Sequence, residues 1–141
     1  DRPVRAVVNT EYQQGMLSSV KCGVHAIGTG YDAVLIALGD QPHIEGAVVS
    51  EVMRAYRDGD AGIVIPRYGD KKGHPIIINL QRYRQAIANL PEDAGLNLLM
   101  QEHADDVRLI DVATDDIIHD IDVPDDYTRE LARFTERRSS L

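Results

Sequence analysis

The stretch VLIALGDQPHI, residues 34–44, joins an apolar run to a polar turn. Residues 34–38 are Val, Leu, Ile and Ala only, which predicts a strand buried on both faces, as in parallel sheets. Gly39 and Pro42 then end the strand, so the carboxylate of Asp40 lies at its carboxyl end. Open α/β sheets bind ligands at that edge. On this stretch alone, a hydrogen-bonded turn and a binding carboxylate explain Asp40 equally well.

The rest of the chain alternates strand and helix patterns. Apolar residues at helical spacing predict helices over 16–27, 44–56, 80–89, 96–103 and 124–138. Short β-rich runs predict strands over 4–8, 33–38, 61–67, 74–79, 107–112 and 117–121. The basic loop YGDKKG, residues 68–73, predicts a hairpin between two of them. This order predicts a single three-layer α/β/α domain over residues 1–141, with a mostly parallel sheet and one antiparallel excursion.

Composition limits the functions that are open to the chain. Lys and Arg total 15 against 23 for Asp and Glu, a net charge of −8, which disfavours nucleic-acid binding. No apolar run approaches the roughly 20 residues that span a bilayer, and no signal segment opens the sequence, so we expect a cytoplasmic protein without a membrane partner. The single cysteine, Cys22, agrees with a reducing compartment. An acidic protein can still bind a phosphorylated ligand if a divalent cation lies between them.

A second acidic segment, DIDVP, begins at Asp120. In an extended segment, side chains two residues apart point to the same side, so Asp120 and Asp122 can face one site. A solvated acidic loop is the alternative, because charge runs usually face water. Together with Asp40, however, these residues supply carboxylates from separate strand ends, which suit Mg²⁺ when phosphates and water complete its octahedron.

Two further segments carry weaker signals. Gly15 permits close backbone approach at a predicted helix start, and Ser18 and Ser19 supply hydroxyls there, although Gly and Ser begin many helices for capping reasons alone. His74 begins a predicted strand after the basic loop, a position where histidine is more often structural than catalytic.

Four segments in this order resemble the molybdenum cofactor cytidylyltransferase family and its guanylyltransferase relatives. They are YQQGMLSSVKCGV (12–24), LIALGDQPHI (35–44), GHPIIIN (73–79) and DIDVPDDY (120–127). The resemblance covers almost the whole chain and implies the fold of nucleotide-diphospho-sugar transferases. It also implies a nucleotidyltransferase, in which the terminal phosphate of molybdopterin attacks the α-phosphorus of CTP or GTP and pyrophosphate is released.

The resemblance implies a role for each motif. Asp40 would bind Mg²⁺, with Asp122 as the second metal ligand and Asp120 as its helper or alternative. The residues near the nucleotide's base and ribose would be Gly15, Ser18 and Ser19. The residues on the side of the pterin substrate would be Gly73, His74 and Pro75.

Two alternatives to this function stay open. The first is a sister nucleotidyltransferase that acts on a sugar phosphate or a polyol phosphate. The second is a non-catalytic module that binds the molybdenum cofactor and delivers it to a molybdenum hydroxylase.

The chain departs from the family pattern at two places. The family begins with a Gly-rich phosphate loop of the kind LAAGxSxRMGxxK, and nothing here matches it, so we expect roughly the first quarter to third of the domain to be absent. Val123 also stands where Thr is usual, which removes a helix-capping hydroxyl at a cost of about 1 kcal/mol.

Overall fold

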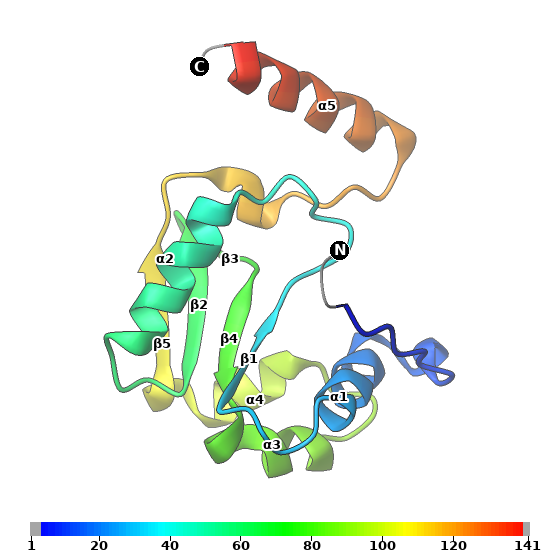
Figure 1. Cartoon of the computed structure of the whole chain (residues 1–141), viewed down its shortest axis with the longest axis vertical. Coiled ribbons are helices and arrows are strands. Elements are labelled where there is room, and N and C mark those ends of the chain that lie inside the picture. Colours follow the sequence, from blue (N-terminus) through cyan, green and yellow to red (C-terminus); the bar gives the residue numbers. More distant parts are fainter. Residues whose placement is uncertain (1–3, 140–141) are drawn as a thin grey trace.

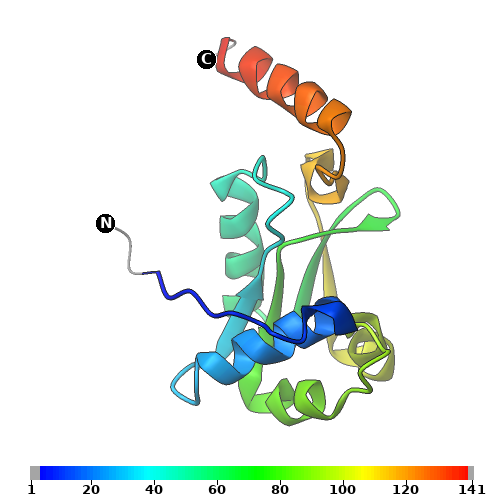
Figure 2. The same ribbon diagram turned by 90° about the vertical axis from the view of Figure 1, so that its right-hand side faces the viewer.

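A computed structural model describes residues 4–139 and forms three layers (Figure 1). The helices are α1 (Met16–Ala26), α2 (Gly46–Arg57), α3 (Leu80–Asn89), α4 (Leu96–Glu102) and α5 (Pro124–Ser139). The strands are β1 (Ala33–Ile36), β2 (Ile63–Tyr68), β3 (Lys71–Lys72), β4 (Ile76–Asn79) and β5 (Val107–Asp111). Three 3-10 helices are η1 (Tyr12–Gln14), η2 (Ala104–Asp106) and η3 (Asp115–Ile118). Helix α2 covers one face of the sheet, and α1, α3 and α4 cover the other (Figure 2).

The sheet confirms the predicted α/β class. Strand β4 lies between β1 and β2 and is antiparallel to both, whereas β5 is parallel to β2. Strands β1, β2 and β5 therefore share one direction, and β4 is the antiparallel excursion. The antiparallel pair of β2 and β4 is the predicted hairpin, and β3, which pairs with the end of β2, lies inside the loop predicted over 68–73. The carboxyl ends of β1, β2 and β5 consequently meet at one edge of the sheet, where ligands bind in open α/β folds.

Burial on both faces explains the uninterrupted apolar runs. On β2 and β4, Ile63 and Ile78 face α1, α3 and α4, while the alternate residues Val64 and Ile77 pack against Val52 of α2. Val52, Ile63, Val64 and Ile78 are completely buried. Because successive side chains point to opposite faces, a strand covered on both sides needs apolar residues at every position.

Two predicted strands are wrong. Residues 4–8 form no strand, and Val4 and Val8 are more than four-fifths exposed, because this β-branched run pairs with no strand among residues 4–139. Residues 115–118 form η3 in place of a strand over 117–121, since Thr114 caps a helical turn by accepting a hydrogen bond from the Asp116 N–H.

Helix α5 begins at the predicted Pro124, with Asp125 and Asp126 in its first turn. It extends beyond the edge of the sheet where β1, β2 and β5 end (Figure 1). None of the helices described within residues 4–139 is long and apolar enough to cross a membrane.

Candidate active-site cleft

The two acidic segments lie side by side at the carboxyl edge of the sheet. The N–H of Ile121 donates to the carbonyl oxygen of Asp40 at 3.0 Å, and Gln41 Nε2 donates to Asp120 Oδ1 at 2.7 Å. Gln41 is buried, so it holds Asp120 from inside the protein. The carboxylates of Asp40 and Asp120 belong to exposed residues and remain open to ligands.

The link between β3 and β4 forms a second wall of the site. A Cβ on Gly73 would lie 2.0 Å from the carbonyl oxygen of Ile117, so only glycine allows this approach. The His74 N–H donates to that same oxygen at 3.3 Å, which fixes the start of the segment against η3. Pro75 is buried, and its peptide bond with His74 is cis.

The charge state of His74 follows from its surroundings. Burial lowers the pKa of His74, and the negative charges of Asp120 and Asp40 only partly oppose this effect. His74 is therefore an uncharged hydrogen-bonding group at neutral pH, within electrostatic reach of both carboxylates.

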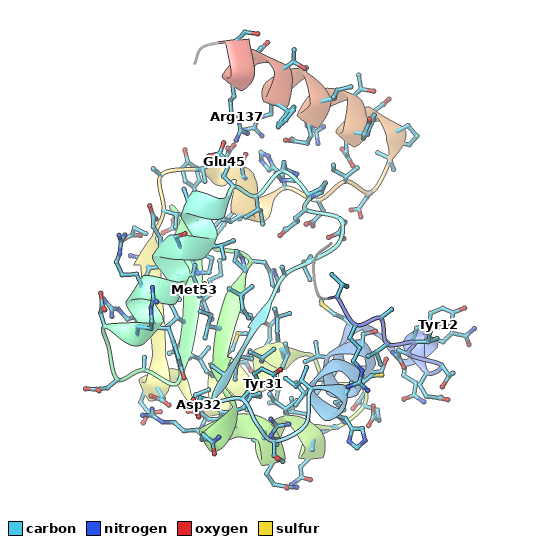
Figure 3. All side chains as sticks on the ribbon, viewed as in Figure 1. Tyr12, Tyr31, Asp32, Glu45, Met53 and Arg137 are labelled. Atoms are coloured by element: carbon cyan, nitrogen blue, oxygen red, sulfur yellow. The ribbon has the colours of Figure 1, made fainter. Side chains whose placement is uncertain are left out.

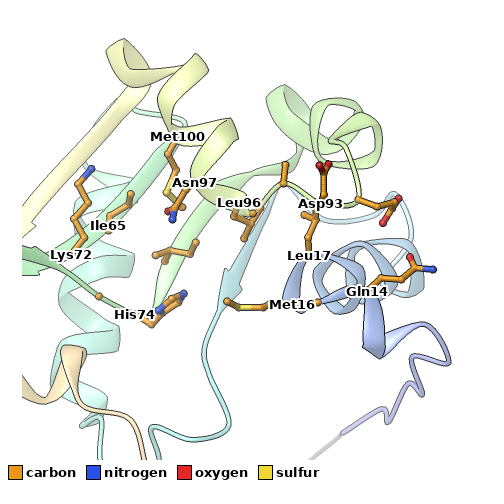
Figure 4. A pocket seen from close by; sticks show the side chains of 16 residues that line it. Gln14, Met16, Leu17, Ile65, Lys72, His74, Asp93, Leu96, Asn97 and Met100 are labelled. Carbon is orange, nitrogen blue, oxygen red and sulfur yellow. The ribbon is translucent and has the colours of Figure 1, made fainter.

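Two adjoining hollows meet at His74. One, of about 530 Å³, is lined among others by Lys71, Lys72, Gln41 and Asp120. The other, of about 500 Å³, reaches from His74 to Gly15, Asp93, Asn97 and Met100. Figure 4 shows Met16 extending from the start of α1 towards His74 and Asn97 pointing in from α4. We call the two hollows together the cleft. It combines two lysines with carboxylates, as a complex of phosphate and divalent cation requires.

The segment 15–19 contributes its backbone more than its hydroxyls. Gly15 has a φ of 98° and lines the cleft, and a Cβ there would have nothing within 4 Å. Ser18 is buried, and its Oγ lies 2.7 Å from Gly15 O and 3.0 Å from Glu11 O. Asn9 Nδ2 donates to the hydroxyls of both Ser18 and Ser19. Ser18 therefore shapes this turn, whereas Ser19 stays exposed.

Asp122 lies apart from these contacts. It is exposed, and its backbone N–H donates to Asp126 Oδ2 at 3.1 Å at the start of α5. Residues 119–122 are not in a strand, so the period-two argument that places Asp122 beside Asp120 has no sheet to support it.

Several cleft residues were not among those predicted from sequence. Gln41 stands inside the GDQP motif, but nothing in the sequence indicates that its amide holds Asp120. The basic loop indicates Lys71 and Lys72 only as charges. The sequence indicates Met16 only as an apolar residue at a helix start and gives no signal for Asn97, because their place in the cleft depends on how α1 and α4 pack against the sheet.

Comparison with known proteins assigns the family. Residues 1–107 match the model of the MobA-like NTP transferase domain. The chain belongs to this family. The molybdenum cofactor cytidylyltransferase of Escherichia coli (strain K12) is 30% identical over 135 residues, which cover 94% of this chain and 65% of that protein.

Solved structures of mycobacterial proteins share the fold of this MobA-like domain. The Rv0371c homologue from Mycobacterium sp. strain JC1 superposes with a TM-score of 0.69 at 29% identity, over 84% of this chain and 58% of that one. Rv0371c from Mycobacterium tuberculosis H37Rv, whose structure was also solved in complex with manganese, gives 0.67 at 25% identity; in the manganese complex the match covers 81% of this chain and 60% of that one. The chain thus spans about three-fifths of the length of the relatives that it matches.

Proposed function

We propose that this MobA-like domain is part of a nucleotidyltransferase that transfers CMP or GMP from CTP or GTP to molybdopterin. Family membership and the similarity to a molybdenum cofactor cytidylyltransferase support this assignment. The observation that carries it is the cleft at the carboxyl ends of parallel strands, in which Asp120 and His74 meet two lysines. Asp40 lies beside it, within electrostatic reach of His74.

The residues present fit Mg²⁺. The carboxylates of Asp40 and Asp120 are oxygen ligands on exposed residues, and Gln41 orients one of them from a buried position. We assign the metal to Asp40 and Asp120, and Asp122 is the alternative second ligand. When bound, Mg²⁺ would neutralise charge on the triphosphate and polarise the α-phosphorus.

The reaction makes few demands on the side chains. An oxygen of the terminal phosphate of molybdopterin forms a bond to the α-phosphorus, and the bond from that phosphorus to the bridging oxygen breaks as pyrophosphate leaves. The attacking phosphate is already ionised near pH 7, so the chain needs no general base. Positioning and charge neutralisation provide the catalysis. Lys71 and Lys72 would hold phosphate oxygens, and neutral His74 would donate or accept one hydrogen bond to the acceptor.

The part of the α4-side hollow next to His74 suits the acceptor, whereas Gly15, which also lines this hollow, stays the proposed contact of the nucleotide's base and ribose. The hollow's volume of about 500 Å³ lies within the usual range of small-molecule sites. Asp93 and Asn97 provide polar groups at its rim, while Leu17 and Ile65 provide apolar walls. A fused pterin ring needs this combination of flat apolar contact and edge hydrogen bonds.

We propose that the open edge of β1 accepts a further strand, the one that would carry the Gly-rich phosphate loop of the family. Among residues 4–139, β1 pairs with β4 alone, so its other edge is open. Apolar hollows of about 220 and 330 Å³ flank the two faces of β1 at this edge. An added strand would cover both, and one of its ends would lie next to Gly39, the residue before Asp40.

The test is pyrophosphate release by the protein as its gene encodes it. Each NTP is paired with molybdopterin, with a sugar phosphate or with a polyol phosphate, in the presence of Mg²⁺. We expect turnover with molybdopterin and CTP or GTP. Turnover only with a sugar or polyol phosphate would replace the acceptor, and tight molybdopterin binding without turnover would indicate a delivery module.

Two variants make the assay specific to the site. Asp40→Asn should remove Mg²⁺-dependent transfer while the protein stays folded, because the substitution changes one exposed carboxylate to an amide. Asp105→Asn is the matched control, since Asp105 is also exposed and lies in η2, before β5 and therefore at the opposite edge of the sheet. Equal activity in both variants would show that Asp40 is not the metal ligand.

A further inference from the structure

Three potential metal ligands converge on one point away from the cleft aspartates. They are His43 from the loop after Gln41, Asp116 from η3 and Glu130 from α5, and their ligand atoms all lie within 4.8 Å of one another. Asp116 and Glu130 are 0% and 4% exposed. None of the three is Asp40, Asp120 or Asp122, so this cluster is separate from the proposed magnesium ligands.

The hydrogen bond made by His43 fixes its tautomer. Nε2 of His43 lies 3.1 Å from the carbonyl oxygen of Asp116, and a carbonyl can only accept, so Nε2 carries the hydrogen. Nδ1 of the neutral ring therefore carries no hydrogen and offers a lone pair. Metal-bound histidines are oriented in this way, with one nitrogen donating to a carbonyl and the other facing the ion.

The cluster contains acceptors without a donor. Within the part of the chain that the structure describes, Nδ1 of His43 and Oε2 of Glu130 are both buried and have no hydrogen-bond partner. Leaving such groups unsatisfied is costly, and one acceptor cannot satisfy another. A cation that both atoms contact would remove both deficits at once.

The surrounding charges also leave room for a divalent cation. Arg137 donates two hydrogen bonds to Asp116, at 2.6 and 2.7 Å, and also reaches Glu45, as Figure 3 shows. Arg133 contacts Asp115 and Glu130. Four carboxylates against these two guanidiniums leave two negative charges, and one remains even when His119, 3.5 Å from both Asp115 and Glu130, is counted as a cation. Arg129 lies 3.7 Å from Glu130 and is itself paired with Asp126. The oxygens of Asp116 still hold free lone pairs beside Arg137, because a carboxylate offers about four.

We propose that His43, Asp116 and Glu130 bind one divalent transition-metal ion, Zn²⁺ or Mn²⁺. The imidazole ligand favours these ions over Mg²⁺, which prefers oxygen alone. Ligands of one such ion lie at most roughly 4.4 Å apart, given bonds of roughly 2.0–2.2 Å, so a small side-chain adjustment closes the site. The ion would tie α5 and η3 to the loop that follows Asp40 and Gln41, and so fix the position of the cleft carboxylates.

Calorimetric titration of the chelator-treated protein with Zn²⁺ and with Mn²⁺, without nucleotide, tests the site. We expect one ion per chain, and Mg²⁺ should not compete at equal concentration. His43→Ala and Glu130→Gln should each weaken binding by more than about tenfold. Removing a residue that only hydrogen-bonds to a metal ligand already costs about tenfold, and these variants remove the ligand itself. His25→Ala, which changes an exposed histidine on α1, should leave this binding unchanged.

A second measurement on the unaltered protein covers variants that do not fold. X-ray absorption of the zinc-loaded protein should show one nitrogen ligand from histidine together with oxygen ligands. Absence of binding without nucleotide would overturn the proposal, as would unchanged binding in folded His43→Ala. Nitrogen NMR that shows both His43 nitrogens protonated with metal present would also overturn it, because a proton on Nδ1 would then occupy the lone pair that the ion needs. Transfer activity is not read in either experiment, so failure here leaves the proposed function standing.

Discussion

The approach of Gly73 to η3 provides a sharp test of how the cleft is built. A Cβ at this position would lie 2.0 Å from the carbonyl oxygen of Ile117, 2.7 Å from its carbonyl carbon and 2.8 Å from its Cβ. Two of these atoms are backbone, so they cannot rotate away. Gly73→Ala must therefore push the β3–β4 link away from η3.

The cost follows from what this displacement breaks. Overpacking in a well-packed region costs about 1–3 kcal/mol. The separation also strains two hydrogen bonds, from Gly73 N–H to Pro66 O at 2.9 Å and from His74 N–H to Ile117 O at 3.3 Å, each worth about 1 kcal/mol. We expect the free energy of unfolding to fall by about 3–5 kcal/mol and Tm to fall by about 6–20 °C, at roughly 2–4 °C per kcal/mol for a domain of this size.

Urea denaturation and thermal unfolding of Gly73→Ala measure this effect. The matched control is Gly30→Ala, because a Cβ on Gly30 meets nothing within 4 Å and its φ is not positive. The control should stay within about 0.5 kcal/mol of the unaltered protein. A Gly73→Ala protein as stable as the control would refute the packing of His74 and its neighbours against η3, and with it the shape of the cleft.

Three further predictions concern ionisable groups. Arg137→Met should lower the free energy of unfolding, measured in urea, by about 3 kcal/mol. This is the low end for a broken buried ion pair, because Arg137 is partly exposed. An unchanged urea midpoint would contradict the pairing of Arg137 with Asp116. Burial alone would raise the pKa of Asp116, but hydrogen bonds from Arg137 lower it. The stabilisation by the Arg137–Asp116 pair is thus present above pH of about 4 and lost as pH falls below it. The Tm difference between Arg137→Met and the unaltered protein should therefore shrink in acid, and a larger difference would refute the coupling. Burial and the hydrogen bond to Asp106 raise the pKa of Tyr83 to about 12. Its contribution to stability should hold below pH of about 10 and vanish towards 12, and Tyr83→Phe should remove one phenolate absorbance step near 12, not one near 10.

The sequence predicts most of the fold because local pattern and burial agree there. Residues 80–89 carry the apolar spacing of a helix, follow the capping Asn79 and end before Pro91, and α3 has these bounds. Residues 4–8 show the limit of the same reasoning. Their β-branched composition predicts a strand, but a strand needs a pairing partner, and composition does not provide one.

The site is less predictable because its contacts join distant parts of the chain. The order of the strands suffices to place Asp40 at the carboxyl edge of the sheet. The strand predicted over 117–121, which would carry Asp120, does not form, so the place of Asp120 depends on the contacts of its segment with Asp40 and Gln41. The burial of Asp116 depends on Arg137, which is 21 residues away on a helix whose direction the sequence does not fix. The role of Gln41 likewise depends on the segment that carries Asp120, 79 residues further along the chain.

The central claim is that the cleft beside Asp40 binds a nucleotide through a divalent cation. A crystal structure of the protein with CTP or GTP and Mn²⁺, with the ion located by its anomalous signal, tests this most directly. We predict an anomalous peak within bonding distance of the Asp40 carboxylate, bridged to the phosphates, with Asp120 or Asp122 as a second ligand. A nucleotide bound with no peak at Asp40, whether or not the His43 cluster holds an ion, would contradict the account.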